Sequence, residues 1–194
     1  LKATDEEYSA CIENDEMIIT PGGEPKLNLP TSLMDSTKSY EFSYRIKFAD
    51  PVEGQYWSWR CYDPNNNVSF GGAVPGNAFG WKEWVPDYSI TAHPEETASS
   101  PANYNTWYTV KIEFCTDSAN RYKKHTLLDA DGKVLFSKKE NVIYAGSEIA
   151  TAIPNETPVT FSSIYFDNCG SSGNVHIDDV MLKEIVREKG VIFE

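Results

Sequence analysis

Aromatic side chains are the residues of this chain whose type and spacing best suit a chemical task, the binding of sugar rings. A sugar ring is polar at its edges and apolar on its C–H faces, so a flat indole can cover one face of it. Trp57 and Trp59 stand two residues apart in a strand-like stretch and therefore share one face. They either contact a ligand or belong to a core between two sheets, and the sequence leaves both roles open.

A second group of aromatic residues lies in segment 63–106, which is rich in proline, glycine and asparagine. Long irregular stretches inside a compact domain are usually functional loops, and burial in the core is harder there. Polar residues near by would form hydrogen bonds with hydroxyl groups, although Asp63-Pro64-Asn65 also has the composition of a simple turn. The candidate ligand-binding residues are Trp81, Trp84, Tyr88, Trp57, Trp59, Arg60, Asp63 and Asn65.

The sequence gives less evidence for a catalytic site than for a sugar-binding site. Glycoside hydrolysis needs two carboxylates facing one cleft, and the adjacent Asp178 and Asp179 would point to opposite sides of a strand. A polysaccharide lyase would need a His or Tyr base and an Arg, Asn or Gln to neutralise a carboxylate, and such residues are scattered: His93, His125, His176, Arg60 and Tyr88. Motifs of zinc proteases, serine hydrolases and nucleotide hydrolases are absent from the sequence. We therefore predict a non-catalytic protein and keep a glycoside hydrolase or lyase as the alternative.

The net charge of the chain limits the classes of ligand that it is expected to bind. With 17 Lys and Arg against 29 Asp and Glu, the net charge is −12. That balance argues against nucleic acid and against an anionic membrane surface, and it favours a neutral glycan. The basic residues gathered in one hairpin are expected to form a solvated strand surface: Arg121, Lys123, Lys124, Lys133, Lys138 and Lys139.

The sequence leaves open whether the protein binds a metal ion and whether its cysteines form disulfides. Asp129 and Asp131 imitate the first positions of a calcium loop, but the sixth position is Val134 instead of glycine, so a hairpin turn is expected there. No cofactor is required, and a structural calcium ion remains an option. Cys11, Cys61, Cys115 and Cys169 form no C-x-x-C pair; they form either two disulfides or four small buried apolar groups.

The elements that must position these residues are strands. Apolar residues alternate with polar ones over 40–48 and 107–115, where we expect Trp107 to be core, and Asp131-Gly132 indicates a hairpin turn. Further strands are expected near 164–166 and over 175–185. No helix of ten residues or more is evident, and no apolar run reaches the roughly 18 residues of a membrane span. The pattern predicts an all-β, two-sheet antiparallel β-sandwich (jelly roll), a single domain over residues 1–194.

Three stretches carry a resemblance to a known group of proteins. The strand Trp107–Ile112, the hairpin Asp129–Leu135 and the closing strand Gly173–Val180 resemble the matching parts of concanavalin A-like lectin/glucanase domains, laminin-G-like jelly rolls that include carbohydrate-binding modules. The resemblance implies the jelly-roll fold and a role with carbohydrates.

Together these observations predict a carbohydrate-binding module, excised from a larger secreted or cell-surface protein. It would target covalently linked catalytic or anchoring domains to a neutral polysaccharide, such as a plant cell-wall β-glucan or hemicellulose, through exposed aromatic side chains. A protein-binding adhesion module is the second alternative.

Overall fold

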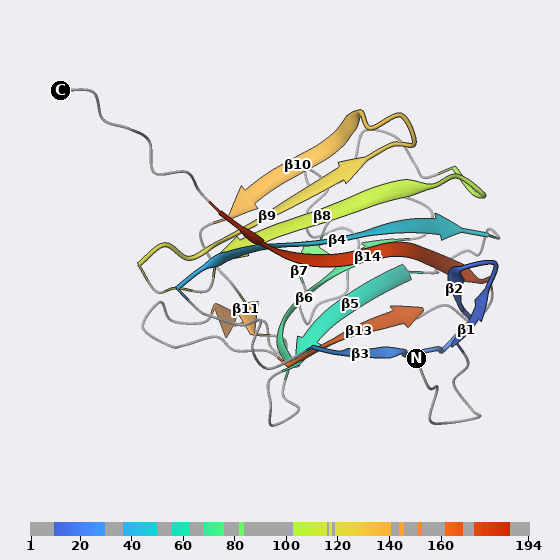
Figure 1. Ribbon diagram of the computed structural model, residues 1–194, viewed down its shortest axis with the longest axis horizontal. Coiled ribbons are helices and arrows are strands. Elements are labelled where there is room, and N and C mark those ends of the chain that lie inside the picture. Colours follow the sequence, from blue (N-terminus) through green and yellow to red (C-terminus); the bar gives the residue numbers. More distant parts are fainter. Residues whose placement is uncertain are drawn as a thin grey trace.

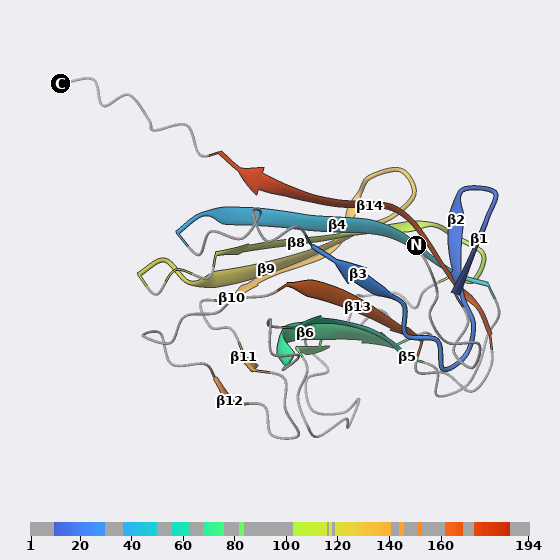
Figure 2. The same ribbon diagram turned by 60° about the horizontal axis from the view of Figure 1, so that its bottom comes forward.

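Two antiparallel sheets stacked face to face contain nearly all of the strands (Figures 1 and 2). The computed structural model describes residues 10–29, 37–49, 56–62, 68–75, 82–83, 103–115, 117, 119–140, 144–145, 151–152, 162–168 and 173–186. Every regular element among these residues is a strand. The described residues contain no helix long and apolar enough to cross a membrane.

The larger sheet has seven strands. Their spatial order is β1 (Ala10–Glu13), β2 (Glu16–Ile19), β14 (Val175–Ile185), β4 (Ser39–Phe48), β8 (Tyr108–Cys115), β9 (Tyr122–Leu128) and β10 (Val134–Glu140). The last strand of the chain thus lies between two of the first strands, as Figure 1 shows. This placement joins the two ends of the domain within one sheet.

The smaller sheet has five strands and covers one face of the larger sheet (Figure 2). Its order is β3 (Lys26–Asn28), β13 (Ser163–Asn168), β5 (Tyr56–Tyr62), β6 (Val68–Pro75) and β7 (Lys82–Glu83). A short pair, β11 (Tyr144–Ala145) and β12 (Thr151–Ala152), forms a separate two-stranded sheet, and β11 lies against β6. The expected all-β, two-sheet jelly roll is confirmed.

The alternation read from the sequence places one face of each strand in the core. On β4 the alternating residues are all at most 5% exposed: Tyr40, Phe42, Tyr44, Ile46 and Phe48. At the β9–β10 turn, Gly132 has a positive φ of 81°, which glycine adopts without the steric cost of a side chain. Asp129 Oδ1 accepts hydrogen bonds from the backbone N–H groups of Asp131 (3.1 Å) and Lys133 (2.9 Å). The expected turn is confirmed, and the Asp129 carboxylate caps it.

Aromatic rings join the two sheets. Phe42 of β4 lies 5.9 Å from Trp59 and 6.0 Å from Phe166, measured between ring centroids. Tyr44 meets Phe166 edge-on at 5.3 Å. Trp59 has none of its surface exposed. Of the two roles that the sequence left open for Trp59, the structure therefore assigns it the core.

One buried side-chain amide ties three strand ends together. Asn168 is fully buried, and its Nδ2 donates to the carbonyls of Ile19 and Gly173, each at 3.0 Å. Its backbone N–H donates to Gly23 O at 3.1 Å, and its carbonyl accepts from Gly22 N at 2.8 Å. Because a buried amide must be satisfied, this network fixes the end of β13 against the end of β2 and the start of β14.

Trp107 is not in the core, which corrects the expectation from its strand. It is partly exposed, and its ring lies 4.7 Å from the Arg45 guanidinium carbon and 4.6 Å from Lys47 Nζ. The neighbouring Tyr108 is buried opposite Ile46 in the register. Since successive strand residues point to opposite faces, the residue before Tyr108 points outward.

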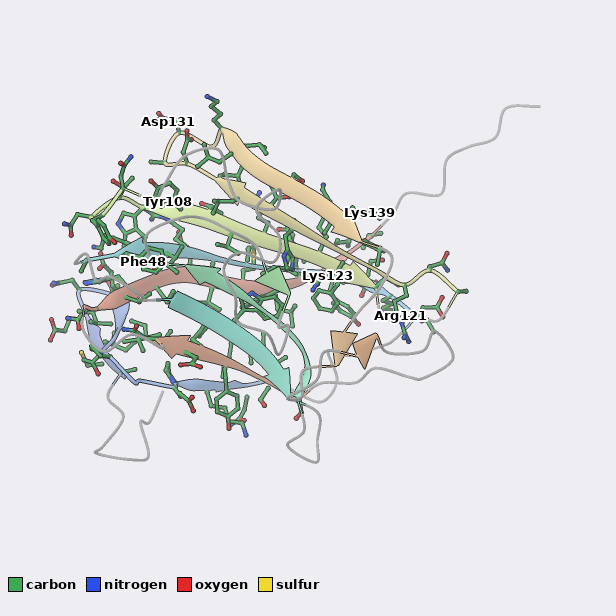
Figure 3. All side chains as sticks on the ribbon, turned by 180° about the vertical axis from the view of Figure 1, so that it is seen from behind. Phe48, Tyr108, Arg121, Lys123, Asp131 and Lys139 are labelled. Atoms are coloured by element: carbon green, nitrogen blue, oxygen red, sulfur yellow. The ribbon has the colours of Figure 1, made fainter. Side chains whose placement is uncertain are left out.

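The basic hairpin is only partly a solvated surface. Lys133 and Lys139 are exposed, as expected, but Arg121 and Lys123 are only 5% and 2% exposed. Figure 3 labels Arg121, Lys123 and Lys139 on the ribbon. Lys123 stands in register with the buried Phe114 of β8 and therefore shares its inward face. The expectation of solvation is thus wrong for Arg121 and Lys123.

Two of the cysteines settle the question of disulfides. Cys11 and Cys115 are both free thiols, so the arrangement with two disulfides does not occur. Cys115 is buried and behaves as a small apolar residue, whereas Cys11 is exposed. The side chains of Cys61 and Cys169 lie outside the described part of the structure.

We expect Trp59→Ala to lower the free energy of unfolding by about 3–5 kcal/mol, because it opens a cavity between the sheets. Trp107→Ala is the matched control and should cost about 1–2 kcal/mol, since it removes two cation–π contacts at a partly exposed site. Urea denaturation followed by circular dichroism measures both. Equal losses would contradict the assignment of Trp59 to the core.

Candidate functional site

The outer face of the five-stranded sheet holds the best-defined group of polar and aromatic residues. On β13, Ile164 and Phe166 are 1% and 2% exposed and point into the core. Alternation therefore turns Ser163, Tyr165 and Asp167 to the outer face.

Strand pairing extends this face into rows. Tyr165 pairs with Lys26 of β3 on one side and with Arg60 of β5 on the other, and Arg60 pairs in turn with Gly71 of β6. Lys26 Nζ lies 5.1 Å from the centroid of the Tyr165 ring. The row therefore reads Lys26, Tyr165, Arg60, Gly71 across four neighbouring strands, and we call it the Tyr165 row.

The adjacent row contains Asp167 of β13, Ser58 of β5, Ala73 of β6 and Lys82 of β7. On the other side of Asp167, hydrogen bonds from Phe166 N to Pro25 O and from Asn168 N to Gly23 O continue the pairing and set the exposed Glu24 opposite Asp167. Glycine inside a strand often marks a place where a ligand approaches the backbone closely. Gly71 is such a residue, at the position next to Arg60.

Burial shows which part of β13 a ligand reaches. Ser163 and Asp167 are only 1% and 5% exposed, although they share the outer face. Tyr165 and Lys26 are partly exposed. The accessible feature of β13 is therefore the tyrosine ring with its neighbouring ammonium group.

The structure places three of the eight sequence-based candidates in this sheet, all on β5: Trp57, Trp59 and Arg60. Trp57 and Arg60 lie on β5, where Trp57 pairs with Asn168 and Val74; their side chains are outside the described part. Lys82 and Glu83 form β7 and pair with β6. Five candidates lie outside the described residues, and two of them, Trp81 and Trp84, directly flank β7 in the sequence: Asp63, Asn65, Trp81, Trp84 and Tyr88.

Sequence reasoning missed Lys26, Tyr165 and Asp167. A signal for two of them was present, because the alternation of Ile164 and Phe166 already predicts that Tyr165 and Asp167 point away from the core. Lys26 carried no such signal, since only the pairing of β3 with β13 brings it beside Tyr165.

A second polar group lies between the sheets. Lys123 and His125 of β9 and Arg121, the residue just before β9, are each at most 5% exposed. His125 meets Trp59 edge-on, with ring centroids 6.1 Å apart. Side chains buried to this degree take part in packing, so the structure gives His125 a place in the core rather than in an open site.

A third group of charged residues lies on the outer face of the seven-stranded sheet, where acidic and basic side chains form ion pairs with each other. Arg45 lies 3.5 Å from Asp178 and 3.6 Å from Asp179. Glu16 Oε2 lies 2.8 Å from His176 Nδ1 and 3.1 Å from Lys47 Nζ. These acids bind side chains of the protein itself. Among the described residues there is no cluster of three or more His, Cys, Asp or Glu that could hold a metal ion.

The hydrogen bond with His176 lowers the pKa of the Glu16 carboxyl below its usual value, and Lys47 acts in the same direction while burial opposes both. A carboxyl whose pKa is depressed by folding contributes stability above its ordinary pKa, and that contribution is lost as the pH falls through the folded-state pKa. Glu16 thereby fastens β2 to β4 and β14 at neutral pH.

We therefore expect Glu16→Gln to flatten the acid dependence of the free energy of unfolding. The parent protein should lose stability more steeply than the variant as the pH falls below about 4.5, the ordinary pKa. Glu13→Gln, an exposed residue of β1, is the matched control that removes one carboxylate. Urea titrations over a pH series measure this, and identical slopes for parent and Glu16→Gln would contradict it.

Comparisons with known proteins bear on the fold. No family model matches the sequence, and neither does any curated protein. Solved structures do match. A carbohydrate esterase from the Shiga toxin-encoding bacteriophage phi24B aligns with a TM-score of 0.56 at 13% identity, over 92% of this chain and 87% of that one.

Two alginate lyases of polysaccharide lyase family 7 are also similar. AlgAT5 aligns with a TM-score of 0.54 at 12% identity, over 94% of this chain and 84% of that one. A1-II′ aligns with a TM-score of 0.53 at 8% identity, over 95% and 84%. At such identities the likeness concerns the fold, and the resemblance read from the sequence is confirmed at that level: the chain has a concanavalin A-like jelly-roll fold.

Proposed function

We propose that this chain is a non-catalytic carbohydrate-binding domain whose ligand lies against the outer face of the five-stranded sheet. The observation that supports the proposal is the Tyr165 row, in which a partly exposed ring stands between two cationic residues of neighbouring strands. The ring offers an apolar surface to the C–H face of a sugar. The flanking residues are donors for its hydroxyl groups.

The strength of such a site suits a targeting role. Covering roughly 100 Å² of apolar surface at about 25 cal/mol/Å² yields about 2.5 kcal/mol before the cost of association. One ring and a few hydrogen bonds therefore give weak binding, in the micromolar to millimolar range (roughly 10⁻⁶ to 10⁻³ M). We propose that the domain tethers linked catalytic or anchoring domains of a larger secreted or cell-surface protein to a polysaccharide.

Hydrolysis is not favoured by this face. The acids of the Tyr165 row and its neighbour are Asp167 and Glu24, which stand opposite each other where the pairing of β13 continues just before β3. Glycoside hydrolases need two carboxylates about 5–9.5 Å apart that face one cleft. Asp167 is only 5% exposed, so a substrate on this face reaches at most one of the two carboxylates.

A polysaccharide lyase is the second candidate, and one observation favours it. The register sets Tyr165 beside Arg60, so a residue type that can move a proton stands next to one that can neutralise a carboxylate. Incubation with uronate-containing polysaccharides tests this candidate, since elimination creates an unsaturated product that absorbs in the ultraviolet. A rise in absorbance that Tyr165→Phe abolishes would replace the non-catalytic proposal.

We expect Tyr165→Ala to weaken glycan binding about tenfold or more, since it removes the ring that covers the sugar. Tyr165→Phe keeps the ring and should bind within a few-fold of the parent. Affinity electrophoresis on gels containing a panel of neutral and acidic polysaccharides measures both, with Trp107→Ala as a control on the opposite sheet. Absence of retardation on every polysaccharide would refute the proposed function.

Trp81 and Trp84 stay candidates for the same ligand, because the residues between them form the edge strand β7 of this sheet. We expect Trp81→Ala and Trp84→Ala each to reduce retardation in the same gels while leaving the urea midpoint close to that of the parent. Unchanged binding by both variants would restrict the site to the Tyr165 row.

A further inference from the structure

Lys26 contacts an aromatic ring, whereas four other described lysines contact carboxylates. Four lysines on or beside the seven-stranded sheet each lie within 3.1 Å of a carboxylate: Lys38 with Glu184, Lys47 with Glu16, Lys124 with Glu113 and Lys183 with Glu41. Among the described side chains, the contact of Lys26 is instead the ring of Tyr165. Its charge is therefore not neutralised by a described acid, on a chain whose net charge is −12.

The register adds a second and a third cationic residue to the same face. Arg60 occupies the position on the far side of Tyr165, and Lys82 ends the adjacent row. Since neighbouring strands lie about 4.8 Å apart, the backbones of Lys26 and Arg60 are about 10 Å apart, with the tyrosine between them. The two rows hold three cationic residues, Lys26, Arg60 and Lys82, and two acids. Asp167 is only 5% exposed, and the exposed Glu24 stands opposite it just before β3.

We infer that the glycan bound by this domain is acidic, and that Lys26 and Arg60 contact its anionic groups on either side of Tyr165. This inference rests on the proposed function and specifies the substrate class of that site. The shared chemistry is an anionic substituent on a sugar, either a carboxylate or a sulfate. Arginine binds such groups through two parallel N–H donors, and lysine binds them as a point charge.

The overall negative charge of the chain does not oppose this assignment. At physiological ionic strength the Debye length is about 8 Å, so acids farther away than that are largely screened by salt. Direct contacts with Lys26 and Arg60 are screened much less. The net charge of −12, which favours a neutral glycan when the sequence is taken alone, is thus outweighed by the charges at the Tyr165 row.

A matched pair of glycans tests the inference. Polygalacturonate and its fully methyl-esterified form share a backbone and differ in the free carboxylates; a sulfated galactan and its desulfated form provide the second arm. Affinity electrophoresis and isothermal titration calorimetry measure binding at low and at high salt. We expect binding to at least one anionic form to exceed binding to its neutral partner about tenfold or more, and to weaken as salt rises.

Substitutions of single cationic residues test which of them bind the anionic glycan. Lys26→Gln and Arg60→Gln should each weaken binding to the preferred anionic glycan about tenfold. Lys139→Gln is the matched control, because it removes the same charge and its Nζ likewise lies over a tyrosine ring, that of Tyr122, at 4.5 Å. Tyr122 is only 5% exposed, so its ring offers no face to a sugar. Lys139→Gln should bind like the parent.

The outcomes separate the inference from the function on which it rests. Equal binding to charged and neutral partners, or equal losses in Lys26→Gln and Lys139→Gln, would overturn the assignment of an acidic glycan and leave carbohydrate binding in place. Failure to bind any glycan in either arm, or in the neutral panel, would overturn both. A change in the urea midpoint of Lys26→Gln is excluded first, by the same denaturation assay.

Discussion

The contact of Phe42 with Trp59 and Phe166 is the constraint on which the arrangement of this domain depends. It is the point where β4 of the larger sheet meets β5 and β13 of the smaller one. Because strand side chains alternate strictly, fixing Phe166 inward turns its neighbour Tyr165 to the outer face, where the register sets Arg60 beside it. A slip of β13 by one residue would expose the Phe166 ring and bury Tyr165, so the core also determines which residues belong to the candidate site.

The outer faces of the two sheets differ in how they treat charge. On the larger sheet, Arg45 and Lys47 lie beside the acids Asp178 and Glu16, and Trp107 packs on both cations. The charged side chains named on this face already have partners within the protein. On the smaller sheet the partner of Lys26 is an aromatic ring, which leaves donors for a ligand. The difference explains why the smaller sheet carries the proposals, although the most prominent exposed charge network lies on the larger one.

Strand alternation in the sequence was sufficient to predict the core side of β4, the β9–β10 turn and the all-β class, because each depends on local periodicity or turn chemistry. It was misleading for Trp107, whose position one residue before the buried Tyr108 turns it outward. It also misled for Lys123, since basic residues are rarely so deeply buried. Only its register beside Phe114 reveals that it faces inward.

The sequence by itself determined the all-β class, the strands with the clearest alternation and the resemblance to concanavalin A-like jelly rolls. The tertiary structure decided which strands are neighbours, and hence that Lys26, Tyr165 and Arg60 form one row although the chain separates Lys26 from Tyr165 by most of its length. Pairing between strands far apart in sequence depends on how the two faces pack, which local periodicity does not encode. The choice between core and ligand for Trp59 was settled in the same way, by the sheet that covers it.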